Sequence, residues 1–299
     1  MTTVAELIAG GAQRIGGAGS ATARLDAELM LAHILEIDRT GVLAHPEAHV
    51  GDTAAARYEA AVDRRAAGEP IAYIVGVREF YGLAFSVDPR ALVPRPDTEL
   101  LVELAGDEIV RRLTGDPRPP GGPPLSIVDV GTGSGAVAIA LAVTMRRRGM
   151  AGEVSIAATD VSAEALEVAV ENAVGHGVAD RIAFYETDLL PPLAETRYDI
   201  VVANLPYVAS AEIDPSPHGP AHEPRVALDG GPDGTAVIVR LIGELPTALA
   251  PGGVALLEIG SGQVDAVVPA IDRLVPGATR IVENDLAGLP RVIRIDGPR

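Results

Sequence analysis

The sequence predicts an α/β fold: a mostly parallel sheet wound by helical crossovers, preceded by a small helical domain and ended by an antiparallel hairpin. Three observations lead to this prediction. Residues 1–70 are rich in Ala, Leu, Glu and Arg with helical spacing, strand and helix patterns alternate from residue 125, and two last strand-like segments flank Gly288. A chain of 299 residues is long enough for a main domain and a smaller companion.

Composition excludes several classes of protein. Hydrophobic residues make up 47% and charged residues 22%, so we expect a folded globular chain. The formal net charge of −17 disfavours a general nucleic-acid binder, because such proteins neutralise phosphates with clustered cations. The one tight basic cluster, Arg146 to Arg148, is expected at the solvated end of a helix, where cations offset the helix dipole.

The same composition bears on the cellular setting. The chain has no cysteine, which excludes disulfides, thiolate metal sites and thiol nucleophiles and is typical of a reducing cytoplasm. No basic stretch followed by an apolar one opens the sequence. Residues 125–145 are long and apolar enough for a membrane span, but Gly131, Gly133 and Gly135 divide them into strand, turn and helix. We therefore expect a soluble, cytoplasmic protein.

The N-terminal third divides into three parts. Within residues 1–70, the spacing of Leu25, Leu29, Ala32 and the pair 34–35 predicts the apolar stripe of a helix. Residues 71–93 have the β-branched and aromatic enrichment of two strands, with Gly82 as the bend. An amphipathic helix is expected from Asp97 or Thr98, either of which is a candidate cap, to Leu113.

A parallel sheet is predicted from residue 125 onward. Residues 115–124 hold five prolines and three glycines, which predicts a surface loop before it. Ligands in open sheets of this kind collect at the carboxyl ends of the strands, so residues there are the site candidates. We expect strands near 125–130, 154–159, 181–186, 198–203 and 253–259, helices near 134–148, 162–174 and 235–249, and a terminal hairpin of 279–284 with 290–295.

A glycine-rich turn joins the first of these strands to its helix. Its residues are Gly131, Thr132, Gly133, Ser134 and Gly135. Glycine permits positive φ and lets a ligand lie against the backbone. Dinucleotide-binding domains, nucleotide binders and methyltransferases all use such a turn, while the lysine of a Walker loop is absent.

Two carboxylates follow the next two strands. Asp160 lies 29 residues after Gly131, farther than in a dinucleotide fold, and its carboxylate is suited to accept both ribose hydroxyls of an adenosine. Its alternative role is to cap the helix near 162–174. Asp188 is placed to accept from an adenine amino group with Leu189 against the ring, or else to form a turn before two prolines.

The quartet Asn204-Leu205-Pro206-Tyr207 follows a hydrophobic strand and is the most informative motif. A planar NH2 group is a poor nucleophile because its lone pair is delocalised. The Asn204 side-chain oxygen and the Leu205 carbonyl can each accept one N–H and shift electron density to nitrogen. Pro206 keeps residue 205 extended, and Tyr207 offers a face to a planar substrate.

The quartet is similar to the Asn-Pro-Pro-Tyr signature of amino methyltransferases, with Leu205 at the first proline. Together with residues 69–76, 79–81, 92–99 and 223–228, it resembles the release-factor glutamine N5-methyltransferase family, over nearly all of the chain. The matching stretches read Glu-Pro-Ile-Ala-Tyr-Ile-Val-Gly, Glu-Phe-Tyr, Leu-Val-Pro-Arg-Pro-Asp-Thr-Glu and Glu-Pro-Arg-Val-Ala-Leu.

The resemblance implies a fold, a cofactor and a substrate. The fold is a Rossmann-like class I methyltransferase domain, 94–299, behind an N-terminal helical bundle, 1–70, and a β-hairpin connector, 71–93. The cofactor is S-adenosylmethionine, without a metal. The implied substrate is the glutamine of the Gly-Gly-Gln loop in peptide chain release factors, methylated on its side-chain nitrogen, and the enzyme is expected to act as a monomer.

The resemblance also implies residue roles. Gly131 to Gly135 pass the methionine part of the cofactor, Asp160 holds the ribose, and Asp188 with Leu189 borders the adenine. Asn204, Leu205, Pro206 and Tyr207 receive the glutamine amide, and residues 94–99 close over the cofactor.

Three other functions remain open at this point. An adenine N6-methyltransferase would use the same quartet, but the acidic balance disfavours it. A nicotinamide-dependent oxidoreductase leaves the quartet without a purpose, and a cofactor-binding module would be non-catalytic. Acidic residues after the quartet, namely Glu212, Asp214 and Glu223, are expected to be solvated or to contact a partner, and His218 and His222 to lie on the surface without a metal.

Overall fold

The computed structural model describes residues 2–115, 122–191, 197–213 and 222–298. The chain divides into two compact units, one covering residues 2–77 and the other beginning at Arg78, and each is described by itself. The predicted proline-rich loop falls at 115–124, and its residues 116–121 lie outside the described part of the chain.

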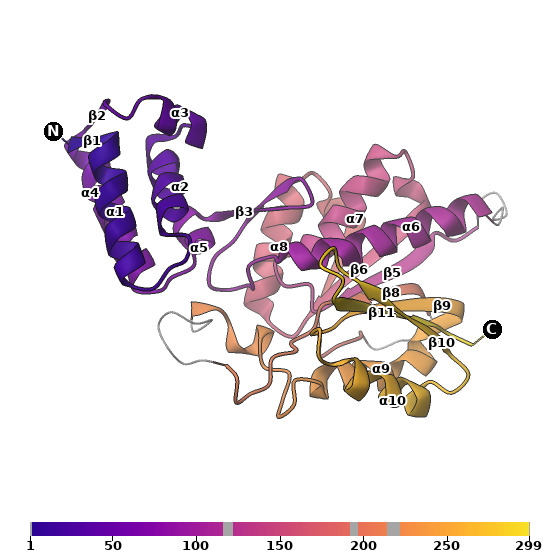
Figure 1. Ribbon diagram of the computed structural model, residues 1–299. Helices are drawn as coiled ribbons and strands as arrows, with labels where there is room; N and C mark the ends of the chain where they lie inside the picture. The colour runs from indigo at the N-terminus through magenta and orange to yellow at the C-terminus, as the bar shows by residue number, and fades with distance from the viewer. Residues whose placement is uncertain (1, 116–121, 192–196, 214–221, 299) are drawn as a thin grey trace. The chain divides into compact units, whose positions relative to one another are not determined.

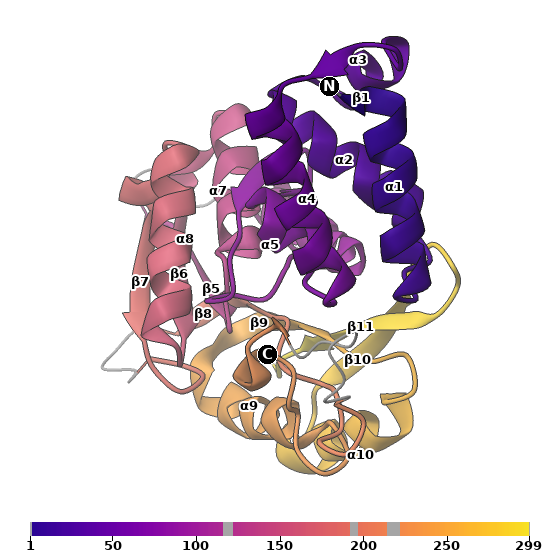
Figure 2. The ribbon, with the colours of Figure 1, turned by 90° about the vertical axis from the view of Figure 1, so that its left-hand side faces the viewer.

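The first unit is a helical bundle. Helices α1, α2 and α4 lie side by side (Figure 2), and their contact buries Ile15, Met30, Leu31, Tyr58 and Val62. Thr3 caps α1 with a capping box to Glu6, which satisfies two backbone donors at the start of the helix. The elements are β1 (Thr2–Thr3), α1 (Val4–Gly17), α2 (Ala23–Leu35), α3 (Arg39–Ala44), β2 (His49–Val50), α4 (Asp52–Ala66) and α5 (Ile71–Val75).

The predicted apolar stripe of α2 is wrong at its N-terminal end. Leu25 and Leu29 are 40% and 37% exposed, whereas Ala32 and Ile34 are buried. The buried stripe runs instead through Ala27, Met30, Leu31 and Ile34. These residues also have helical spacing, but they lie on a different side of the helix from Leu25 and Leu29. Two carboxylates, Asp26 and Glu28, are buried beside this stripe. Asp26 pairs with Arg65, and Glu28 pairs with Arg24 and Arg39, so the arginines offset the cost of burying the two charges.

The predicted strand pair between residues 71 and 93 is present only in part. Strands β3 (Val77–Phe80) and β4 (Leu83–Ser86) pair, and the turn between them holds Gly82 at φ 67° as expected. Residues 71–75 form the short helix α5 instead of a strand. Pro70 precedes this helix, and Gly76, at φ 78°, ends it. These helix start and stop residues outweigh the β propensity of the residues between them.

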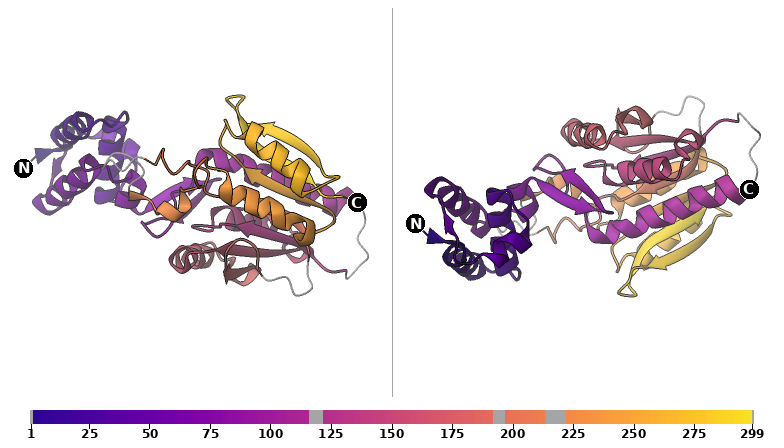
Figure 3. Two further views of the ribbon diagram at one scale, coloured as in Figure 1. Left: turned by 90° about the horizontal axis from the view of Figure 1, so that it is seen from below. Right: turned by 90° about the horizontal axis from the view of Figure 1, so that it is seen from above.

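A twisted sheet forms the core of the second unit. In the described residues it has seven strands in the order β10-β11-β9-β8-β5-β6-β7, parallel from β7 to β9 and antiparallel at β11 and β10. The predicted fold class is confirmed, including the terminal hairpin, seen in yellow in Figure 3. The strands are β5 (Leu125–Val130), β6 (Val154–Asp160), β7 (Ile182–Glu186), β8 (Tyr198–Ala203), β9 (Leu249–Glu258), β10 (Thr279–Asn284) and β11 (Pro290–Asp296).

Helices cover both faces of this sheet. Figure 1 shows α6, α7 and α8 over one face and α9 with α10 over the other. Their bounds are α6 (Glu99–Gly115), α7 (Ala136–Arg147), α8 (Ala163–Gly175), α9 (Ala236–Ala248) and α10 (Val264–Leu274). Helix α10, which holds Pro269, was not among the predicted elements. No helix in the described ranges has both the length and the hydropathy to cross a membrane.

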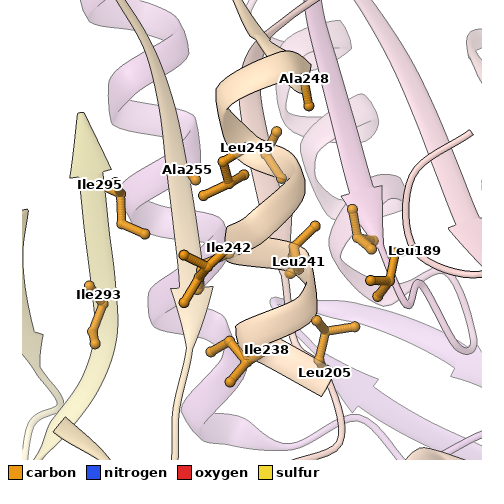
Figure 4. Close-up of a cluster of buried hydrophobic side chains, with 14 of the residues drawn as sticks. Leu189, Leu205, Ile238, Leu241, Ile242, Leu245, Ala248, Ala255, Ile293 and Ile295 are labelled. Carbon is orange, nitrogen blue, oxygen red and sulfur yellow. The ribbon is translucent and has the colours of Figure 1, made fainter. Parts of the chain in front are cut away.

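A core cluster of buried hydrophobic side chains lies between the sheet and helices α9 and α10. Figure 4 shows Leu241, Ile242 and Leu245 of α9 facing side chains from several strands. All three are fully buried, and Leu205 and Leu189 from the carboxyl edge of the sheet join the same cluster. The core thus extends directly beneath the edge where ligands are expected.

Truncating Leu241 tests this packing. Leu241→Ala should lower the free energy of unfolding by about 3 kcal/mol, because the mutation removes a fully buried side chain from a core that cannot collapse around the gap. Urea unfolding followed by circular dichroism measures this loss. The matched control is Leu286→Ala at a fully exposed position, where a change within about 0.5 kcal/mol is expected. Equal small losses for both variants would contradict the account.

Candidate active site

A cavity of about 550 Å³ opens at the carboxyl ends of the parallel strands. It lies where the strand order reverses, because the chain leaves β5 toward β6 on one side and returns to β8 on the other. Its wall includes most of the predicted site residues. Those in the wall are Gly131, Gly133, Asp160, Asp188, Leu189, Asn204, Leu205 and Pro206.

The glycine turn presents backbone to this cavity. Gly131, Gly133 and Gly135 have φ of 72°, 55° and 81°, a region that residues with a Cβ rarely adopt. A Cβ at Gly133 would meet nothing within 4 Å, whereas one at Gly135 would lie 2.8 Å from Ile139 Cδ1. Gly133 therefore borders open space, whereas the absence of a side chain at Gly135 lets the start of α7 lie close to Ala169 of α8.

The side chains of Thr132 and Ser134 are both buried, and neither residue is in the cavity wall. The Thr132 hydroxyl donates to Asp129 Oδ2 at 2.7 Å. The Ser134 carbonyl accepts from Asn172 Nδ2 at 3.0 Å, and Asn172 also bonds both backbone groups of Ser86. These two residues hold the turn in place, and the turn's glycine backbone faces the cavity.

Two aspartates fix the turn from the strands. Asp129, 1% exposed, also accepts from the Ala138 amide at 3.1 Å, and burial raises its pKa to about 6. Asp160 ends β6 and accepts from the Gly133 and Ser162 amides at 2.8 and 2.9 Å. Burial raises the pKa of Asp160, although these backbone donors oppose the shift. Ser162, not Asp160, caps α8 through the Ala165 amide.

Asp188 and Leu189 follow β7 at the same edge. Leu189 adopts φ 65°, which is strained for a residue with a side chain, and its carbonyl accepts from the buried Thr159 hydroxyl at 2.7 Å. The Asp188 carboxylate is bonded by Arg240 of α9 at 2.5 Å, and both residues line the cavity. Arg240 is a polar residue of the cavity wall that no sequence motif predicted.

The quartet follows β8 directly. Asn204 Nδ2 donates to the buried Thr98 hydroxyl at 2.8 Å, and no described donor bonds its Oδ1. The Leu205 side chain is buried against the glycine turn, since a Cβ at Gly131 would lie 3.0 Å from Leu205 Cδ2. The Tyr207 carbonyl accepts from Gln263 at 2.9 Å, and burial raises the pKa of the Tyr207 phenol, so it stays neutral.

Thr98 lies in the short 3-10 turn η1 (Pro96–Thr98), within the segment expected to close over the cofactor. The structure instead places Arg90, Ala91 and Leu92 in the cavity wall, while Thr98 contacts Asn204.

Glu223 corrects another expectation. It is not a solvated loop carboxylate: its side chain is 3% exposed, accepts from the Val93 amide at 3.1 Å and pairs with Arg95. This pairing ties the segment before α6 to the segment that follows the quartet. Glu212 is exposed as expected, and Asp214 and His218 lie outside the described residues.

The sequence analysis assigned no role to Asn172, Arg240 or Glu258, and it gave Thr98 and Glu223 roles other than the contacts that the structure shows. Each acts through a partner that is distant in sequence, so no local motif marks it. The one available signal was the placement of Glu258 within an otherwise apolar run, residues 254–259. Within the part of the chain that the structure describes, no group of three or more His, Asp or Glu residues is arranged to hold a metal ion.

Comparisons with known proteins agree with this geometry. A family model described as the PrmC N-terminal domain matches residues 6–76, and one described as the methyltransferase small domain matches residues 122–216. The release factor glutamine methyltransferase of Bradyrhizobium diazoefficiens is 39% identical over 289 residues, covering 94% of this chain and 91% of that protein. The enzyme of the same name from Moorella thermoacetica is 40% identical over 265 residues, covering 89% and 88%.

A solved structure supports the fold alone. The hMettl16 catalytic domain in complex with a MAT2A 3′UTR hairpin superposes with a TM-score of 0.54 at 17% identity, covering 78% of this chain and 82% of that one.

The sheet order, the glycine turn and the cavity define a class I methyltransferase that uses S-adenosylmethionine. The residues present suit this cofactor, because open backbone at Gly133, a half-buried acceptor at Asp160 and a cavity of fitting size meet in one place. Given its identity to full-length relatives, the chain belongs to the release factor glutamine methyltransferase family.

Restoring proline at position 205 tests what that residue contributes. Leu205→Pro should not raise turnover by more than about tenfold, or about 1.4 kcal/mol of barrier, because the backbone carbonyl is already present and Pro206 already restricts it. The variant should also unfold more easily, since Leu205 packs on Gly131 and in the core below α9. Steady-state kinetics and urea unfolding measure the two effects. A larger rise in turnover would show that the lack of a stiff residue at position 205 limits the turnover of the wild-type enzyme.

Proposed function

We propose that this protein transfers a methyl group from S-adenosylmethionine to the side-chain amide nitrogen of the glutamine in the Gly-Gly-Gln loop of peptide chain release factors. The observation that carries the proposal is the orientation of Asn204: its Nδ2 is held by Thr98, and its Oδ1 is left as an acceptor beside the cavity. The names of the full-length relatives point to the same substrate.

The acceptor site follows from these residues. Asn204 Oδ1 and the Leu205 carbonyl each accept one N–H of the glutamine amide, which localises the lone pair on nitrogen and aims it at the cavity. Pro206 keeps the Leu205 carbonyl in place, and Tyr207 contacts the planar amide. Asn204 and the Leu205 carbonyl thus act mainly by proximity and orientation.

The donor site is proposed in the same cavity, along the glycine turn and the residues that follow β6 and β7. When bound, S-adenosylmethionine supplies an electrophilic methyl group on a positively charged sulfur. Gly131 to Gly135 border its methionine part, Asp160 accepts from the ribose hydroxyls, and Asp188 with Leu189 borders the adenine. Arg240 competes with any adenine donor for Asp188, so this pair adjusts when the site fills.

The remaining assignments complete the proposal. Residues 1–70 form the helical bundle, 71–93 the connector and 94–299 the catalytic domain. The enzyme acts as a monomer in the cytoplasm without binding nucleic acid directly. The net charge of −17 favours encounter with a basic partner, and release factors must contact ribosomal RNA.

Replacing Asn204 tests the acceptor site. Asn204→Ala should lower kcat on a release factor by about 100-fold, because one of two acceptors for the amide is removed. The affinity for S-adenosylmethionine, measured by calorimetry, should change little. Asn284→Ala, at an exposed position on β10, is the matched control and should behave as the wild type. Parallel loss of activity and cofactor affinity would make Asn204 a cofactor-binding or structural residue.

The substrate is tested with methyl-labelled S-adenosylmethionine. The purified protein should label a release factor but neither its Gly-Gly-Gln variant with Gln→Ala nor duplex DNA. Label on DNA adenine would favour the N6-methyltransferase function instead. Tight cofactor binding without any transfer would favour a non-catalytic module.

A further inference from the structure

A buried carboxylate lies next to the acceptor site and takes no part in the mechanism so far. Glu258 is the last residue of β9 and is 1% exposed. Because Ala203 pairs with Leu257 across the parallel ladder, Glu258 and Asn204 leave the sheet side by side. Neither oxygen of Glu258 makes a hydrogen bond with a described residue, which is costly for a buried acid, but the Thr98 hydroxyl is near enough to lower the pKa of this carboxyl.

Four polar groups face this carboxylate. They are the Thr98 hydroxyl and Asp97 from η1, Arg291 from β11, and the Tyr207 phenol. Arg291 is already paired with Asp97 and Asp285, at 3.1 and 3.2 Å. Burial raises the pKa of Glu258 to about 7, against the opposing effects of Thr98 and of the Arg291 charge. The Tyr207 phenol does not titrate near neutral pH, because burial raises its pKa further.

Thr98 connects this acid to the acceptor site. Its hydroxyl accepts from Asn204 Nδ2 at 2.8 Å, and a hydroxyl has a single proton to donate. An ionised Glu258 draws that proton toward itself, so Thr98 can only accept from Asn204. This state keeps Nδ2 on Thr98 and leaves Oδ1 for the substrate amide.

We propose that Glu258 is a positioning residue that acts through the Thr98 hydroxyl to set which way the Asn204 amide faces. The inference rests on the proposed function. When Glu258 is protonated, its own proton can be donated to Thr98, and the Thr98 proton is then free to bond Asn204 Oδ1. The amide can now turn over and present a donor where the substrate needs an acceptor.

The consequence is a pH dependence of turnover. Activity is present when Glu258 is ionised and declines as pH falls through about 7. With saturating cofactor and release factor, kcat at pH 8 should exceed kcat at pH 6 by about tenfold in the wild type. Glutamine at position 258 does not titrate between pH 6 and 8, so the ratio of kcat at pH 8 to kcat at pH 6 in Glu258→Gln should be below about twofold.

The matched control is Glu108→Gln. Glu108 is another buried carboxyl of the same unit, but Arg111, Arg112 and Arg294 hold its pKa near 2 in spite of burial. It does not titrate between pH 6 and 8, so this variant should keep the wild-type ratio even if it is less stable. A ratio in Glu258→Gln equal to that of the wild type overturns the proposal.

A second pair of variants guards against misfolding of Glu258→Gln. Thr98→Val removes the hydroxyl and should lower kcat at least tenfold with KM for the cofactor nearly unchanged. Thr98→Ser restores the hydroxyl and should regain most of that loss. Equal kcat for Thr98→Val and the wild type contradicts the proposal. If the wild type itself fails to methylate release factors, the proposed function fails, which is a distinguishable result.

Discussion

The site depends on one buried carboxylate at the end of the central strand. Asp129 accepts from the Thr132 hydroxyl and from the Ala138 amide, so it joins β5, the glycine turn and the first turn of α7. With these bonds made, the turn needs no side chain of its own in the cavity, and Gly131 and Gly133 can offer backbone to a ligand. Asp160 then holds the turn from the neighbouring strand through the Gly133 amide. The proposed cofactor and acceptor sites both depend on this anchoring, since Leu205 packs directly on Gly131.

Segments far apart in sequence complete the acceptor side. Glu223 binds the Val93 amide and Arg95, and Thr98 receives the Asn204 amide. The stretch before α6 is therefore part of the active site through its contacts, although residues 94–99 are absent from the cavity wall that the described residues form. The signature around Thr98 and the quartet work as one unit because the fold brings them into hydrogen-bond contact.

The sequence predicted the sheet well and the supporting contacts poorly, for physical reasons. Parallel strands such as β5 and β8 are buried on both faces and appear as continuous apolar runs, so their bounds were predicted to the residue. The stripe of α2 was misplaced because Asp26 and Glu28 are buried with arginine partners, which no periodicity reveals. The glycine, acid and quartet positions could be singled out as candidates because each follows a strand, whereas Thr98, Glu223 and Glu258 are marked only by contacts between distant residues.

The central claim is that Asn204 and the Leu205 carbonyl receive the glutamine amide. It is tested most directly by a crystal structure of the full-length protein with a release factor and the demethylated cofactor product. The account predicts the glutamine amide nitrogen within hydrogen-bond distance of both Asn204 Oδ1 and the Leu205 oxygen, with Asn204 Nδ2 still on Thr98. A glutamine amide bound elsewhere in the cavity, or an Asn204 amide turned the other way, would contradict it.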